Sequence, residues 1–218
     1  MILLAIDTAT ESCSAALLVN GKLFSRSTVQ PRLHAELILP FIDELLNEAQ
    51  IKKNAIQGLV IGQGPGAFTG VRIGVGVAQG IALALEIPVV AVSNLQTLAF
   101  STYQQLNTTQ EKIILVATDA RMKEVYSARY SIVGDQIKTI NAESVGSADK
   151  VDLSAIDAYI GSGFAVYPEL IAHCENQPMH YPVNVYSAAK EMLLMVKDDF
   201  NQLSSTIDII EPVYLREP

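Results

Sequence analysis

The sequence is poor in cysteine, in basic residues and in long uninterrupted apolar runs. Its two cysteines, Cys13 and Cys174, are far apart and show neither a disulfide framework nor a metal-ligand spacing, so we expect ordinary reduced thiols. The chain has 15 Lys and Arg against 23 Asp and Glu, a formal net charge of −8, and no basic run exceeds Lys52-Lys53. Because phosphate neutralisation dominates nucleic-acid affinity, this charge argues against direct binding to RNA or DNA. Any RNA in its function must be held mainly by a partner.

Signals for membranes and secretion are also lacking. Asp7 interrupts the opening apolar stretch too early for a signal peptide, and the central apolar run at 73–78 ends at Gln79, so we expect no membrane span. These absences predict a cytoplasmic protein. Half of the residues are nevertheless hydrophobic, and the mean hydropathy is +0.28. Such an apolar composition without a span indicates that part of the surface is buried against another protein.

What the sequence does have is a glycine-rich stretch at 61–85, IGQGPGAFTGVRIGVGVAQGIALAL, which reads as a buried strand, a tight loop and a helix. Eight of the 13 glycines fall between Gly58 and Gly80. Glycine inside a helix costs about 1 kcal/mol relative to alanine, so Gly70, Gly74 and Gly76 predict that another backbone packs very close. Internal packing alone is the other interpretation.

The glycine loop matches neither familiar phosphate-binding pattern. A Walker loop ends in Gly-Lys-Ser/Thr, whereas Gly70 is followed by Val71. A dinucleotide fold needs an acid after the next strand, and that strand closes with Val-Ser-Asn. Both phosphate-loop interpretations are therefore weak.

The first half of the chain predicts the element order β-β-β-α-β-α-β. The turn Asn20-Gly21 is a strong hairpin signal, and Pro40 is expected to kink or loosen the first helix because it cannot donate a backbone hydrogen bond. A meander followed by crossovers predicts a mixed sheet covered by helices, as in ribonuclease-H-like lobes. The expected strands are Ile2–Asp7, 14–19, 22–28, Gly58–Gly62 and 88–93, and the expected helices are 33–49 and the one after the glycine loop.

The second half opens with a pattern like that of the first. ILVATDARMKEVYSARY resembles LLAIDTATESCSAALL, each with an apolar strand, an acid, a turn and a second strand, which suggests two related lobes at 1–106 and 107–218. Chance recurrence is the alternative, because this pattern is short. A helix at 95–106, a strand at 136–145 and a helix at 187–200 are also expected.

Five segments carry a resemblance that spans nearly the whole chain: AIDTAT, HAELILP, GPGAFTGVRIGVGVAQG, DARMKEVY and PVYLR. The chain resembles the TsaB (YeaZ) family, whose members belong to the machinery that makes threonylcarbamoyladenosine next to the anticodon of tRNAs reading A-starting codons. The resemblance implies an α/β fold of actin/Hsp70-like (ASKHA) architecture with two ribonuclease-H-like lobes. It also implies a non-catalytic scaffold subunit that forms a heterodimer with a TsaD-like catalytic paralogue.

The resemblance extends to cofactors and further partners. ATP and metal are expected on the TsaD-like partner, with no cofactor required by this chain. A TsaE-like ATPase is a further expected partner, a homodimer is possible when the chain is alone, and tRNA is reached only through the complex. An autonomous ATP-dependent kinase of the same fold and a peptidase stay open as alternative functions.

The partner surface is expected on the two helices of the first lobe. The apolar residues of the helix at 33–49 cover an arc of about 200°, more than one core needs. The second helix is apolar almost all round except for a seam of Arg72, Gln79 and Glu86, which predicts cover on both sides. We expect its core side at Gly70, Gly74, Val77, Ile81 and Ala84. The predicted interface residues are Leu37, Phe41, Leu45, Arg72, Val75, Gly76, Gln79 and Leu83.

A vestigial nucleotide pocket is the second candidate site. By the resemblance, Asp7 and Thr8 match the phosphate and magnesium positions of actin-like proteins, and Asp119 matches their counterpart in the second lobe. Gly161 and Gly163 are what remains of an adenosine loop. The alternative is that both acids simply cap turns, which Asp side chains do readily.

No metal site is expected. The catalytic paralogue should bind metal through His-x-x-x-His, whereas here His34 is followed four residues later by Ile38. His173 and His180 have no ligand spacing either. Two further departures from the family concern loops: Ala67 replaces a usual Ser and so loses a helix cap worth about 1 kcal/mol, and Lys123 replaces a common Gly in the turn of DARMKEVY.

Overall fold

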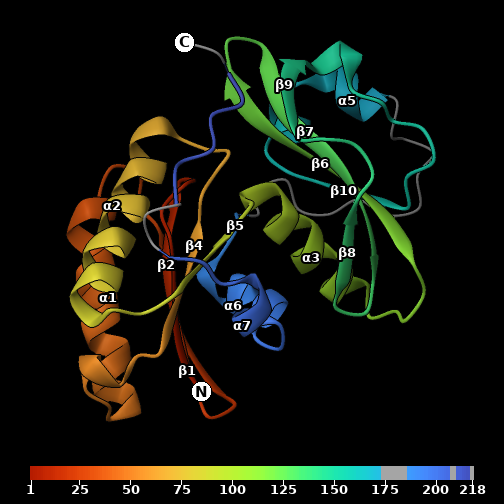
Figure 1. Cartoon of the computed structure of the whole chain (residues 1–218). Coiled ribbons are helices and arrows are strands. Elements are labelled where there is room, and N and C mark those ends of the chain that lie inside the picture. Colours follow the sequence, from red (N-terminus) through yellow and green to blue (C-terminus); the bar gives the residue numbers. More distant parts are fainter. Residues whose placement is uncertain (173–185, 207–209, 217–218) are drawn as a thin grey trace. The chain divides into compact units, whose positions relative to one another are not determined.

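The structure is a computed structural model that describes residues 1–172, 186–206 and 210–216 (Figure 1). The chain forms two compact units: unit 1 comprises Met1–Asn94 and Ser187–Val213, and unit 2 comprises Leu95–Tyr186 and Tyr214–Pro218. These bounds differ from the division expected at residue 106. The helix that begins at Asn94 packs its apolar side on the second sheet, and the helical segment after Ser187 returns to the first sheet.

Unit 1 contains a five-stranded sheet in the order β3-β2-β1-β4-β5. β1 is antiparallel to β2 and parallel to β4, with Ala5 aligned to both Ala16 and Val60. This is the mixed sheet of a ribonuclease-H-like lobe, as predicted. Asn20 and Gly21 both have positive φ, which closes the β2–β3 hairpin as the sequence indicated. The strands are β1 (Ile2–Asp7), β2 (Ser12–Val19), β3 (Lys22–Val29), β4 (Gly58–Gly62) and β5 (Val89–Val92).

Helices cover both faces of this sheet. α1 (His34–Ala49) and α2 (Phe68–Leu85) pack on one face, which receives Leu4 and Ile6 of β1. α6 (Ala189–Val196) and α7 (Phe200–Leu203) pack on the other, against Leu3 and Ala5. The alternation along β1 therefore builds two apolar layers, and Figure 1 shows α1 and α2 on one side of the strands with α6 on the other. A short 3-10 turn, η1 (Lys53–Ala55), precedes β4.

Unit 2 repeats the beginning of this topology in the order β10-β6-β7-β8. β6 is antiparallel to β7 and parallel to β10, as β1 is to β2 and β4. The single strand expected at 136–145 is wrong: β8 and β9 are separate strands that pair with different parts of β7. The elements are α3 (Asn94–Leu106), β6 (Lys112–Arg121), β7 (Glu124–Val133), β8 (Gln136–Thr139), β9 (Ser144–Ser147), η2 (Ala148–Lys150), β10 (Ala158–Ile160), α4 (Gly163–Val166) and α5 (Pro168–Ala172).

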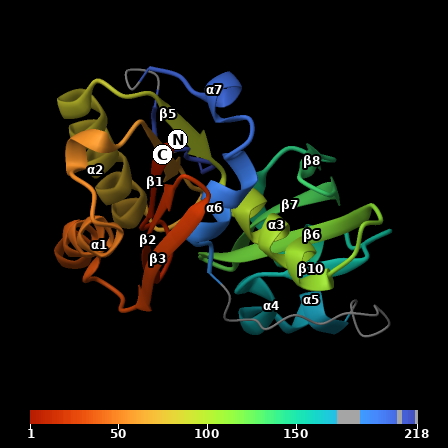
Figure 2. The same ribbon diagram turned by 90° about the horizontal axis from the view of Figure 1, so that it is seen from below.

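The core of unit 2 also has two layers, and Figure 2 shows α3, α4 and α5 beside the strands of this unit. Leu98 and Tyr103 of α3 pack with Val116 of β6, whereas Phe164 and the segment after it pack with Leu115 on the other face. The rings of Tyr159 and Phe164 lie 4.6 Å apart. Each unit therefore has its own mixed sheet covered by helices, in agreement with the predicted fold class.

By length and composition α2 is apolar enough to cross a membrane, and it is the one such helix among the described residues. It packs instead on β4 and β1, and Val71, Ala78 and Ala82 are buried in unit 1. The inner side of α2 is therefore a layer of the protein core, and 33% of the helix is buried.

Candidate functional site

Asp7 lies at the end of β1 and is completely buried. Its Oδ1 accepts hydrogen bonds from the backbone N of Ala9 at 3.0 Å and from Asn94 Nδ2 at 2.9 Å. Its Oδ2 accepts from Ser187 Oγ at 2.5 Å and again from Asn94 Nδ2 at 3.0 Å. Each carboxylate oxygen thus accepts two hydrogen bonds. These bonds occupy the lone-pair positions with which the carboxylate would bind a cation or a water molecule next to a phosphate.

Burial raises the pKa of Asp7 above its ordinary value, and hydrogen bonds from Ser187, Ala9 and Asn94 lower it in partial compensation. Neutral hydrogen-bond donors are therefore the main groups that lower this pKa, and His34 adds a smaller electrostatic lowering.

The residues after Asp7 pack directly on the start of α2. Thr8 Oγ1 donates to the carbonyl of Gly70 at 2.7 Å, and the backbone N of Ala67 donates to the carbonyl of Ala9 at 2.7 Å. A Cβ at Gly70 would lie 2.1 Å from the Thr8 carbonyl oxygen, and one at Gly66 would lie 2.2 Å from that of Ala9. The protein's own backbone therefore fills the space before α2 that a phosphate-binding loop leaves open.

On one side of α2 the helix glycines pack closely against the chain itself, which is the alternative of internal packing. A Cβ at Gly74 would lie 2.7 Å from Thr8 Oγ1, so Gly70 and Gly74 both make room for the loop after β1. At Gly76 a Cβ would meet no atom of the described residues within 4 Å, so the close backbone expected there stays a prediction. Ala67 makes no side-chain cap, and its backbone bond to Ala9 is what ties this end of the helix to the loop.

Asp119 is the corresponding acid in unit 2, near the end of β6. Its Oδ1 accepts from Tyr167 Oη at 2.8 Å and from the backbone N of Arg121 at 2.9 Å, and its Oδ2 lies 3.2 Å from Arg121 Nη1. Burial, and secondarily the bond to Asp119, raises the pKa of Tyr167 to about 12. The acid is thus held by one phenol and by its own turn.

The two glycines of the expected adenosine loop pack on the same strand. A Cβ at Gly161, where φ is +126°, would lie 2.1 Å from the carbonyl oxygen of Ala117, and one at Gly163 would lie 2.9 Å from it. Ser162 Oγ accepts from the backbone N of Asp119 at 3.0 Å. Asp7 and Thr8 therefore gather within unit 1, and Asp119, Gly161 and Gly163 gather within unit 2. In both places the polar groups are used by the protein itself.

Comparison with known proteins places these features in a family. The family model described as "TsaD: tRNA N6-adenosine threonylcarbamoyltransferase" matches residues 27–175. The "tRNA threonylcarbamoyladenosine biosynthesis protein TsaB" of Escherichia coli K12 is 34% identical over 223 residues, covering 99% of this chain and 95% of the relative. The protein of the same name from Haemophilus influenzae is also 34% identical, covering 99% and 94%.

A solved structure agrees with this result. YeaZ from Pseudomonas aeruginosa is 35% identical, superposes with a TM-score of 0.85, and is matched over 98% of this chain and 99% of that one. The chain belongs to the TsaB (YeaZ) family.

Two of the predicted interface residues are not on the surface of this TsaB-family chain. Leu45 and Val75 are 0% and 4% exposed and belong to the core of unit 1. The reason is that α2 is rotated about its axis relative to the predicted orientation. Val71 and Val75 face the sheet together with Gly70 and Gly74, whereas Ala84 is exposed.

The other six predicted interface residues remain at least partly accessible. Leu37 and Phe41 lie at the margin of the core, and the exposed members on α2 are Arg72, Gly76, Gln79 and Leu83. Leu83 is 72% exposed. Gln79 Nε2 also donates to the carbonyl of Ile210 at 3.3 Å, so this side chain holds the C-terminal segment.

Sequence reasoning missed one member of this surface. Phe68 begins α2 and is 57% exposed, and the guanidinium of Arg72 lies 3.6 Å from the centre of its ring. The spacing of four residues between an aromatic and a cation was the available signal.

The lone histidine of the HAELILP motif is a structural residue. His34 Nε2 lies 2.8 Å from the carbonyl oxygen of Thr10, and Ile38 is buried in the core. The described residues contain no cluster of three or more His, Cys, Asp or Glu suited to a metal. His173, His180 and Cys174 lie outside the described residues.

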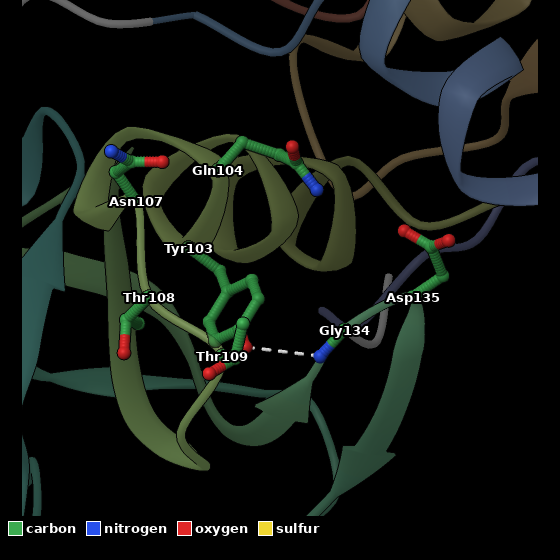
Figure 3. A pocket seen from close by; sticks show the side chains of 7 residues that line it. All are labelled: Tyr103, Gln104, Asn107, Thr108, Thr109, Gly134 and Asp135. Carbon is green, nitrogen blue, oxygen red and sulfur yellow. Dashed lines mark hydrogen bonds between the residues drawn. The ribbon is translucent and has the colours of Figure 1, made fainter.

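A polar cavity of about 190 Å³ lies in unit 2, away from every predicted site residue (Figure 3). Tyr103 Oη crosses its floor, accepts from the backbone N of Gly134 at 3.0 Å and donates to the carbonyl of Gln110 at 3.2 Å. The Tyr103 hydroxyl in this cavity is therefore already paired within the protein. The lining residues are Tyr103, Gln104, Asn107, Thr108, Thr109, Gly134 and Asp135.

Proposed function

We propose that this chain is a non-catalytic subunit that pairs with a TsaD-like paralogue in forming threonylcarbamoyladenosine next to the anticodon of tRNAs that read A-starting codons. The relatives over nearly the full chain are named as biosynthesis proteins of this nucleoside. The observation that carries the non-catalytic role is the saturation of Asp7: both carboxylate oxygens are used by Ala9, Asn94 and Ser187 inside unit 1.

The proposal assigns cofactors and RNA to the partners. The chain itself requires neither metal nor nucleotide, and ATP and metal belong to the TsaD-like subunit, with a TsaE-like ATPase as an additional member. A net charge of −8 supports contact with tRNA only through the complex. The cellular location that fits this role is the cytoplasm.

The surface proposed for the TsaD-like partner is the α1/α2 face, defined as Leu37, Phe41, Phe68, Arg72, Gly76, Gln79 and Leu83. It combines exposed apolar side chains with a position, Gly76, that has open space above its backbone. A helix that is apolar on its outer side as well as its inner side is stabilised by a second cover. A partner helix could approach the backbone of α2 closely at Gly76.

A leucine at Gly76 tests this interface. Gly76→Leu leaves the fold of unit 1 intact, because nothing lies within 4 Å of the added Cβ, but it adds bulk where the partner would sit, with an expected cost of about 1–3 kcal/mol in binding. The matched control is Gln104→Leu, an exposed position on α3 of unit 2. Sedimentation velocity with the TsaD-like protein, with circular dichroism to check folding, should show weaker binding only for Gly76→Leu. Equal affinity of folded Gly76→Leu and wild type would move the interface to another surface.

The cellular role is tested by depleting the protein and measuring modified nucleosides by mass spectrometry. Threonylcarbamoyladenosine should fall in tRNAs that read codons beginning with A. Unchanged levels would contradict the proposed function. Turnover of ATP by the purified chain, lost in Asp7→Ala, would instead support an autonomous kinase.

A further inference from the structure

The chain connects the two units three times. At each connection, the residue on the unit 1 side is held by hydrogen bonds. The connections follow Asn94, precede Ser187 and follow Val213. These residues are far apart in sequence, yet all three are bonded to Asp7 or to the glycine loop.

The first two connections meet at Asp7. Asn94 Nδ2 donates to both carboxylate oxygens and to Ser187 Oγ at 2.7 Å, and Ser187 Oγ donates to Asp7 Oδ2. The three side chains therefore form a closed triangle of hydrogen bonds, and all three residues are at most 1% exposed. Ser14 Oγ accepts from the backbone N of Ala189 at 3.0 Å and fixes the segment just after Ser187.

The third connection is tied to the same place through the glycine loop. Asn94 Oδ1 accepts from the backbone N of Gly64 at 2.7 Å, and the backbone N of Asn94 donates to the carbonyl of Gly64 at 3.0 Å. The neighbouring carbonyl of Gln63 accepts from the backbone N of Val213 at 2.8 Å. Gly62 is confined by this arrangement, because a Cβ there would lie 2.7 Å from Asp7 Oδ1.

We infer that Asp7 is the central acceptor of a hydrogen-bonded node that fixes all three connections to unit 1. The node consists of Asp7, Gln63, Gly64, Asn94, Ser187 and Val213. A buried network in which every donor has an acceptor is rigid. Removing the carboxylate leaves the Asn94 and Ser187 donors unpaired in the protein interior, which frees the chain at both places. The acid after the first strand thus serves to hold the connections.

Asp119 supplies a matched comparison. It occupies the equivalent place near the end of β6, but it bonds Tyr167, Arg121 and Ser162, none of which lies at a connection between units. A general effect of removing a carboxylate after a central strand would appear for both acids, whereas an effect on the connections should appear for Asp7 alone.

The experiment is hydrogen–deuterium exchange on the full chain, comparing wild type, Asp7→Asn and Asp119→Asn. In Asp7→Asn the side-chain amide keeps the shape of the carboxylate, but its own N–H groups face the donors of Asn94 and Ser187. We expect at least about tenfold faster exchange at the backbone amides of Asn94, Ala189 and Val213 in Asp7→Asn. The central β1 and β2 amides should stay within about twofold of wild type, and Asp119→Asn should leave the three connection amides within the same limit.

Ser187→Ala is a second variant that removes one bond of the triangle and keeps the carboxylate. It should accelerate exchange at Asn94 and Ala189 less than Asp7→Asn does, and it decides the matter if Asp7→Asn does not fold. Unchanged connection amides in folded Asp7→Asn or Ser187→Ala would overturn the inference. Acceleration spread evenly over β1–β5 would also overturn it, because Asp7 would then be a general core residue.

Discussion

The corner around Asp7 and the corner around Asp119 have the same place in two similar sheets but different partners. Each acid lies at or near the end of a strand that is antiparallel to the next strand and parallel to a later one. Asp7 takes its side-chain donors from residues 87 and 180 positions away, whereas Asp119 bonds its own turn and a tyrosine 48 positions away. An acid at the same place in two similar sheets can therefore have different roles. Asp7 joins segments that are distant in sequence, whereas Asp119 stabilises its own hairpin.

The loops that follow the two acids also differ in the segments that stabilise them. The loop after Asp7 is covered by α2 through Thr8 and Ala9. The turn after Asp119 is exposed, and its residues Arg121, Met122 and Lys123 all have positive φ. Arg216 braces this turn by donating to the carbonyl of Ala120 and by pairing with Glu124. Hydrogen bonds and close packing on α2 hold the first loop, whereas hydrogen bonds and an ion pair with Arg216 hold the second.

The largest expected effect comes from the glycines that allow α2 to cover the first corner. Gly70→Ala would place a Cβ 2.1 Å from the Thr8 carbonyl oxygen, so it should cost at least about 3 kcal/mol of unfolding free energy or prevent folding. Gly76→Ala on the same helix meets nothing and should stabilise by up to about 1 kcal/mol. Urea unfolding measures both, and similar stabilities for the two variants would contradict the packing described for Gly70.

The sequence predicted the parts of this comparison that depend on local pattern. The strands Ile2–Asp7 and Gly58–Gly62 were predicted at their observed bounds. Each is a short apolar run that ends at a residue typical of turns, an aspartate in the first and a glycine in the second. The orientation of α2 was not predicted, since glycines on several sides leave the apolar pattern nearly symmetrical around the helix. The bond between Asn94 and Ser187 spans 93 positions, and no local pattern in one sequence reveals such a pair.

The next effect compares the two acids themselves. Asp7→Ala should cost about 3 kcal/mol of unfolding free energy, because it leaves buried donors of Asn94 and Ser187 without a partner. Asp119→Ala should cost about 1 kcal/mol, since water can reach the turn that it leaves. Chemical denaturation of both variants at neutral pH measures the difference. Equal losses would mean that the partners recruited from distant segments add nothing to stability.

A smaller effect concerns the strained turn of unit 2. Lys123 has a φ of +64°, a conformation that costs a non-glycine residue roughly 1 kcal/mol. Lys123→Gly should therefore stabilise the protein by about 0.5–1 kcal/mol despite the greater freedom of glycine in the unfolded chain. Lys52→Gly is the matched control, because Lys52 has a φ of −85° and no such strain to relieve. Thermal unfolding should show a rise only for Lys123→Gly, and a fall in both would remove the argument for strain at this turn.

The smallest effect is a titration with no consequence at neutral pH. The pKa of Tyr167 is raised from 10.0 to about 12, first by burial and then by its bond to Asp119. Because the folded-state pKa is raised, the folded protein keeps the phenol proton to higher pH than the unfolded chain does. The stabilising contribution is therefore complete below about pH 10 and is lost as the pH rises toward about 12. The difference in phenolate absorbance between wild type and Tyr167→Phe gives the pKa directly. Asp119→Asn should lower it while leaving it above 10.0, since burial is the larger cause, and an Asp119→Asn protein with an unchanged Tyr167 pKa would show that the acid does not hold the phenol.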